Sequence, residues 1–120
     1  MTKDPATPAE LVAALDQVTA QARHLTRRGR AAFCADDLDG QVARLAACQV
    51  VIQVQAVIED LPPAALDALA DLPLHAVRGM RNRLAHGCGD TDPALLWQTM
   101  AVALPGLAAT VRRVLADLPG

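Results

Sequence analysis

The feature that most constrains this chain is an apolar-periodic segment that begins after Asp36 and Asp37 and ends at Pro62 and Pro63. Apolar residues recur at helical spacing throughout it: Val42, Leu45, Ala46, Val50, Val54, Val57, Ile58 and Leu61. Either aspartate is a suitable N-cap, and the proline pair cannot continue a helix. The segment therefore predicts one helix of roughly 25 residues, which would be about 37 Å long at about 1.5 Å per residue.

A first helix is predicted upstream of this segment. Thr7 can be its N-cap, Pro8 takes the first helical position, and Glu10 completes a capping box. Apolar residues again recur at helical spacing: Leu11, Leu15, Val18, Ala22 and Leu25. Arg27, Arg28 and Gly29 have the character of a helix C-terminus.

Three helices are predicted downstream of the proline pair. A short one covers residues 64–70, and a second, over about residues 73–87, stops at Gly87. The last begins at Asp92 and Pro93 and continues to about residue 118. Pro105 is expected to kink it, because proline removes one backbone donor and clashes with the preceding turn.

Composition agrees with a helical fold. Apolar residues make up 52% of the 120 residues, yet there is one Phe, one Trp and no Tyr. A core of Ala, Leu and Val suits closely packed helices, whereas sandwiches and barrels favour aromatic and β-branched residues. We therefore predict a single domain over residues 1–120, all-α, with a bundle of four to five helices. The long helices also offer apolar surface for pairing two copies.

The formal net charge of −2 does not indicate a nucleic-acid-binding protein, but the arginines are clustered. One cluster comprises Arg23, Arg27, Arg28 and Arg30, and another Arg78, Arg81 and Arg83. Such local patches can contact a phosphate backbone even on an acidic chain. A solvated helix face is the simpler interpretation of the first cluster.

Metal, cofactor and membrane binding are not expected. His86 and Cys88 could contribute to a metal site, but no second ligand pair has suitable spacing. No uninterrupted apolar run approaches the roughly 18–20 residues of a membrane span, and the N-terminus has no signal-peptide core. The sequence predicts a cytoplasmic protein without a metal or cofactor.

The stretch GMRNRLAHGCG, residues 79–89, carries the most unusual chemistry. On a helical wheel Arg81 falls inside the apolar arc, between Leu74 and Val77. Arginine cannot lose its charge on burial, so it needs a carboxylate or phosphate partner, or an edge to reach water. A structural interpretation pairs it with one of the acidic residues of the neighbouring helix: Asp36, Asp37, Glu59 or Asp60.

A catalytic interpretation combines Arg81 with Asn82 and His86. Cleavage of a phosphodiester without a metal needs a base, an acid and a cation that stabilises the phosphorane. His86 is alternatively an ordinary helix C-terminal histidine, which the helix dipole favours. Residues five apart also point roughly 140° away from each other on a regular helix. Catalysis therefore needs an unwound helix end or a second chain.

Residues 79–86 resemble the Arg-x4-His motif of the HepT-like family in the HEPN superfamily, whose segment typically reads Gly-Met-Arg-Asn-Arg-Leu-Val-His. The surrounding sequence, from about residue 36 to 115, resembles the family more loosely: a long helix ends at Leu61-Pro62, and Trp97 and a late proline follow the motif. The resemblance implies an all-α homodimer that is a metal-independent endoribonuclease, the toxin of a toxin–antitoxin pair with a minimal nucleotidyltransferase antitoxin.

The resemblance also implies roles for individual residues. Arg81 and His86 match the catalytic pair, in a cleft between two protomers, and Asn82 matches the polar residue beside the arginine. Arg78 is a candidate for RNA backbone contact, with solvated surface as its alternative. The family tyrosine that the antitoxin adenylylates is replaced here by Cys88. A non-catalytic helical module that binds a nucleotide or a nucleotidyltransferase is therefore kept as the alternative function.

Overall fold

The computed structural model describes residues 6–69 and 91–118, and within these ranges every regular element is a helix. In chain order the elements are α1 (Pro8–Thr26), α2 (Arg30–Cys34), α3 (Leu38–Glu59), α4 (Pro63–Ala68), α6 (Pro93–Gln98), the π-helical η2 (Thr99–Ala103) and α7 (Leu104–Asp117). The predicted all-α class is confirmed. The predicted helix over residues 73–87 lies outside the described residues.

The N-terminal helix α1 begins as its sequence predicts. The Thr7 hydroxyl accepts a hydrogen bond from the Glu10 amide at 3.2 Å, and Pro8 opens the helix. The helix ends at Thr26, and Gly29 follows with φ of +93°. Only glycine adopts this backbone conformation without strain, so it reverses the chain direction here. The buried side chains of α1 are Leu11, Leu15, Val18, Thr19 and Ala22.

A short helix that the sequence analysis did not anticipate, α2, connects α1 to α3. It packs on α6 through the chain's two aromatic rings, since the Phe33 and Trp97 centroids lie 5.7 Å apart with a 58° tilt. Arg44 of α3 fixes its C-terminus, because Arg44 Nη1 donates to the carbonyl oxygens of Phe33 at 2.7 Å and Ala35 at 2.9 Å. A cation at the end of a helix is favoured by the helix dipole.

The long helix α3 begins at the second of the two candidate caps. The Asp37 carboxylate accepts from the Gly40 amide at 2.8 Å, and the Pro62–Pro63 pair separates α3 from α4. Gly40 lies against the end of α2, where an added Cβ would overlap the Ala35 carbonyl oxygen. The glycine therefore permits the close approach of α3 to α2.

The last helical stretch begins where predicted and is irregular near its proline. Asp92 caps α6 through a 2.9 Å bond from the Ala94 amide, and Pro93 takes the first helical position. The π-helical turn η2 lies directly before Pro105, with the Leu104 amide bonded to the Thr99 carbonyl. A proline ring collides with the carbonyl four residues earlier, and a wider turn relieves that collision.

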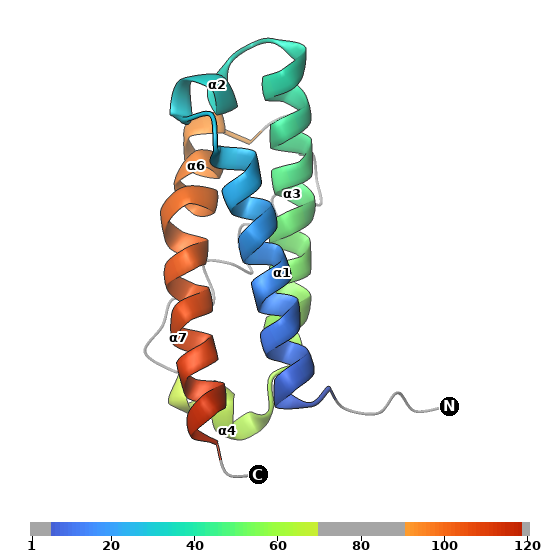
Figure 1. The fold of residues 1–120 in the computed structure, drawn as a ribbon, viewed down its shortest axis with the longest axis vertical. Coiled ribbons are helices and arrows are strands. Elements are labelled where there is room, and N and C mark those ends of the chain that lie inside the picture. Colours follow the sequence, from blue (N-terminus) through green and yellow to red (C-terminus); the bar gives the residue numbers. More distant parts are fainter. Residues whose placement is uncertain (1–5, 70–90, 119–120) are drawn as a thin grey trace, which may run out of the picture.

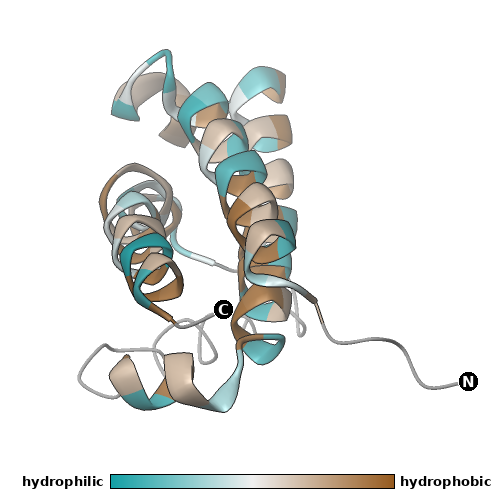
Figure 2. Ribbon diagram, turned by 60° about the horizontal axis from the view of Figure 1, so that its bottom comes forward, coloured by the Kyte–Doolittle hydropathy of each residue, from teal (hydrophilic) through white to brown (hydrophobic). Residues whose placement is uncertain are grey.

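The core lies between α1, α3 and the α6–η2–α7 stretch, which run side by side along the bundle (Figure 1). Hydrophobic and hydrophilic residues alternate along α1 and α3, as amphipathic helices require (Figure 2). The largest fully buried side chains are Leu15, Leu69, Leu96, Met100, Gln55, Val51 and Val111. Three long helices with small and aliphatic side chains thus form the framework, and α2 and α4 cover its two ends.

Two stretches of the described chain are long and apolar enough to cross a membrane by length and composition alone, Leu38–Glu59 and Pro93–Asp117. Within their most apolar windows, 44% and 28% of the residues are buried in the protein. The core helix of a soluble protein satisfies the same criteria, so this is weak evidence for a membrane span.

Candidate functional site

The residues that the sequence analysis assigns to the site fall in one segment. Arg78, Arg81, Asn82, His86 and Cys88 all lie in residues 70–90, outside the described residues. Their predicted roles therefore stay predictions based on sequence.

The chain enters and leaves this segment at opposite ends of the bundle. Leu69, directly before it, is 1% exposed and follows α4, beside the C-terminus of α7. Thr91 and Asp92, directly after it, precede α6 at the end of the bundle where α2 lies (Figure 1). The motif segment is thus joined at both ends to packed helices of the core.

The four candidate acidic partners of Arg81 form two separate pairs. Asp36 and Asp37 precede α3, whereas Glu59 and Asp60 end it. At about 1.5 Å per residue the two ends of this 22-residue helix are about 30 Å apart. Asp37 already caps α3. A single Arg81 side chain can therefore contact at most one pair.

Gln55 is a candidate that the sequence analysis missed. Its side chain is buried in the core, and its Nε2 donates to Glu59 Oε1 at 3.2 Å. Its Oε1 is buried without a hydrogen-bond partner. The Glu59 carboxylate fixes this orientation, because the flipped amide would bring two acceptor oxygens together. An unsatisfied buried acceptor costs about 1–3 kcal/mol and is available to a donor. The signal in the sequence is a glutamine between Val54 and Val57 in an apolar run.

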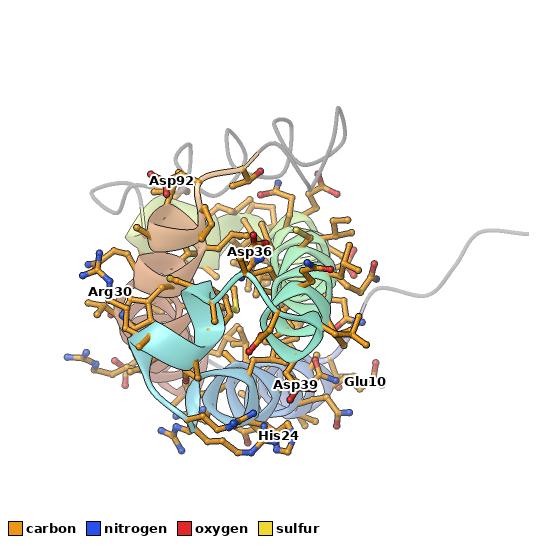
Figure 3. All side chains as sticks on the ribbon, turned by 90° about the horizontal axis from the view of Figure 1, so that it is seen from above. Glu10, His24, Arg30, Asp36, Asp39 and Asp92 are labelled. Carbon is orange, nitrogen blue, oxygen red and sulfur yellow. The ribbon has the colours of Figure 1, made fainter. Side chains whose placement is uncertain are left out.

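The first arginine cluster lies where α1 ends and α2 begins. Arg23, His24, Arg27, Arg28 and Arg30 are all exposed, and His24 and Arg30 point away from the bundle (Figure 3). Arg27 Nη1 donates to the His24 carbonyl at 2.6 Å. Exposed acids lie at the same end: Asp36, Asp37 and Asp39. This mixture of charges favours a solvated helix end over a uniform phosphate-binding surface.

The same end holds an exposed ion pair between Arg28 Nη1 and Asp39 Oδ2, which are 3.4 Å apart. Both side chains are mostly in water, with 60% and 81% of their surface exposed. A pair of this kind contributes about 0–1 kcal/mol to stability. It leaves both side chains free to meet a charged partner.

No metal-binding constellation occurs among residues 6–69 and 91–118, where no three His, Cys, Asp or Glu side chains come together. The crevice between α1, α3 and α7 is lined only by apolar side chains, including Leu15, Val54 and Val111. Ligand pockets combine an apolar lining with a few polar groups that orient the ligand. This crevice lacks such groups and is a packing gap within the core.

A comparison with known protein families complements this geometry. The model of a family described as ribonuclease HepT-like matches residues 15–114, which is more than half of the chain. The match includes α3 and the α6–η2–α7 stretch as well as the motif segment. No curated protein and no solved structure matches the chain.

Proposed function

Because this chain belongs to the HepT-like ribonuclease family, we propose that it is a metal-independent endoribonuclease whose Arg81 and His86 cleave RNA. The observation that carries the proposal is the Arg81-x4-His86 motif inside the matched range. The alternative, an arginine and a histidine held only by structural contacts, would not require both residues at this spacing in a ribonuclease family.

The proposed chemistry follows from the side chains. A base removes the proton from the RNA 2′-hydroxyl, and the 2′-oxygen forms a bond to phosphorus. The bond from phosphorus to the 5′-oxygen breaks, and an acid protonates that oxygen. The imidazole of His86 serves as acid or base near neutral pH, and the Arg81 guanidinium stabilises the charge of the phosphorane. Asn82 and Arg78 are proposed to hold the substrate phosphates.

We place this site between two copies of the chain. One histidine cannot be base and acid at once, and residues five apart on a regular helix point roughly 140° away from each other. Two subunits supply two imidazoles and two guanidinium groups to one cleft. The proposed active form is therefore a homodimer.

The proposed biological role is that of a cytoplasmic toxin, controlled by a cognate minimal nucleotidyltransferase antitoxin. Cys88 stands where the family carries the tyrosine that receives the nucleotide. A thiol is a poor acceptor for an adenylyl group compared with a phenol. We therefore propose that binding of the antitoxin, rather than modification at position 88, neutralises this chain.

The direct test is cleavage of labelled RNA by the purified chain in a buffer with EDTA. Arg81→Ala and His86→Ala are each expected to slow cleavage by at least about 100-fold, the lower range for general acid–base catalysis. His24→Ala and Arg113→Ala are matched controls, because these exposed side chains lie on α1 and α7. Cleavage that persists at full rate in His86→Ala would contradict the mechanism.

Cys88 also favours a second candidate function, a non-catalytic module that binds a nucleotide or a nucleotidyltransferase in the same pocket. Expression of the chain alone in bacteria separates the two. Growth arrest that His86→Ala relieves supports the ribonuclease. Harmless expression together with binding of AMP or ATP by the purified chain supports the module.

A further inference from the structure

Helix α3 carries a row of large apolar side chains on its outer face. Their exposed fractions are 73% for Leu38, 55% for Val42, 61% for Leu45 and 39% for Ile52. Exposed aliphatic side chains are ordinary when scattered, but a contiguous row marks a surface that another molecule covers.

The spacing of this row indicates which kind of molecule covers it. Leu38, Val42, Leu45, Gln49, Ile52 and Ala56 follow one another at alternating steps of four and three residues, all within α3. This is the spacing with which the core positions of one helix meet those of a second, parallel or antiparallel, helix. A flat ligand or an extended peptide does not require it.

We propose that this row, the α3 seam, is where a second copy of the same chain packs, with the two α3 helices antiparallel. This deepens the homodimer of the proposed function by naming its contact face. A two-fold axis near residue 47 would bring Leu38 opposite Ala56 of the partner subunit, and Val42 opposite the partner's Ile52. Each large side chain at one end then faces a smaller one at the other.

The charges at the two ends of the seam favour the antiparallel arrangement. Arg28 and Asp39 lie beside its first turn, and Glu59 and Asp60 end the helix. Antiparallel packing brings the partner's Glu59 and Asp60 toward the arginine cluster at the α1–α2 end, where His24 and Arg30 also lie (Figure 3). Parallel packing would instead place each acidic residue opposite its own copy, which is repulsive.

Gln49 supports the same register. It is the polar member of the seam and lies beside the proposed two-fold axis. A single polar residue at a core position of paired helices fixes their register at some loss of affinity, because only one alignment satisfies its hydrogen bonds. The seam thus combines aliphatic contact with one polar register mark.

The first test measures self-association by sedimentation equilibrium without RNA, over about 1 µM to 1 mM chain, the range of a moderate affinity. Leu45→Glu is expected to raise the dimer dissociation constant at least about 100-fold, because the dimer would bury two unpaired carboxylates. Val102→Glu is the matched control, a 57% exposed aliphatic residue on η2. A wild-type chain that stays monomeric, or a dimer that Val102→Glu dissociates and Leu45→Glu does not, overturns the proposal.

The second test reads the register and does not depend on a destabilising charge. The full chain with Val42→Cys is mixed with the chain with Ile52→Cys and treated with a short bis-maleimide, with the wild-type chain as background. Antiparallel packing predicts cross-links between the two variants. Within either variant alone the two new thiols would lie about 15 Å apart along the seam. Cross-links within each variant alone, or none above background, overturn the antiparallel seam. Both tests read assembly, so an inactive dimer would refute the ribonuclease and leave the seam intact.

Discussion

Replacement of Gly40 by alanine tests the packing of α3 against α2. An added Cβ would overlap the Ala35 carbonyl oxygen and lie 3.1 Å from both the Ala32 carbonyl oxygen and Arg44 Nη1. The overlapped atom belongs to the backbone, so it cannot rotate away. Relief requires that α2 shift and that the bonds from Arg44 to Phe33 and Ala35, 2.7 and 2.9 Å long, stretch.

The opposing effects differ enough to decide the sign. Alanine gains at most about 1 kcal/mol over glycine from helix propensity. Overpacking costs about 1–3 kcal/mol, and each weakened bond from a charged donor adds about 1.5 kcal/mol. We expect Gly40→Ala to lower the free energy of unfolding by about 2–4 kcal/mol.

The matched control is Gly106→Ala in α7, where an added Cβ meets nothing within 4 Å. It should raise the free energy of unfolding by about 0.5–1 kcal/mol. Urea unfolding followed by far-ultraviolet circular dichroism, at one protein concentration, measures both. If Gly40→Ala lies within about 0.5 kcal/mol of the wild type, the close approach of α3 to α2 is wrong.

Two further substitutions are read in the same assay. Asp37→Ala removes the cap bond to the Gly40 amide and should cost about 1 kcal/mol, whereas the adjacent Asp36→Ala should change stability by less than about 0.5 kcal/mol; equal losses would refute Asp37 as the cap. Gln55→Leu removes a buried oxygen that has no partner and should raise the free energy of unfolding by about 1 kcal/mol. A loss of similar size would mean that this oxygen accepts a hydrogen bond.

Most helix boundaries could be predicted because they depend on local chemistry. Thr7, Pro8, Asp92 and Pro93 act within three residues of their own position, and the structure confirms each as a helix start. The choice between Asp36 and Asp37 needed the structure, because either carboxylate can cap and only the backbone decides which amide it meets.

Features that depend on distant contacts could not be predicted. Helix α2 is five residues long, too short for apolar periodicity, and is held by Arg44 and by the Phe33–Trp97 contact. The π-helical turn before Pro105 replaces a simple kink, since the neighbouring helices fix the path of the chain on both sides. For the site, the motif predicts the catalytic groups Arg81 and His86, but a single sequence does not show how their side chains converge.

The two faces of α3 together indicate why this helix needs a protein partner. Its inner face buries Val50, Val51 and Val54, and its outer face exposes the α3 seam. A helix that is apolar on opposite sides belongs in a larger core or in a lipid bilayer. Lipid is the poorer solvent here, because a span would carry Arg44 and Gln49 into hydrocarbon, and a central arginine alone costs about 2.5–3.5 kcal/mol. A second α3 covers the seam and leaves Arg44 on its carbonyl acceptors, so the outer face fits a helix of the same spacing.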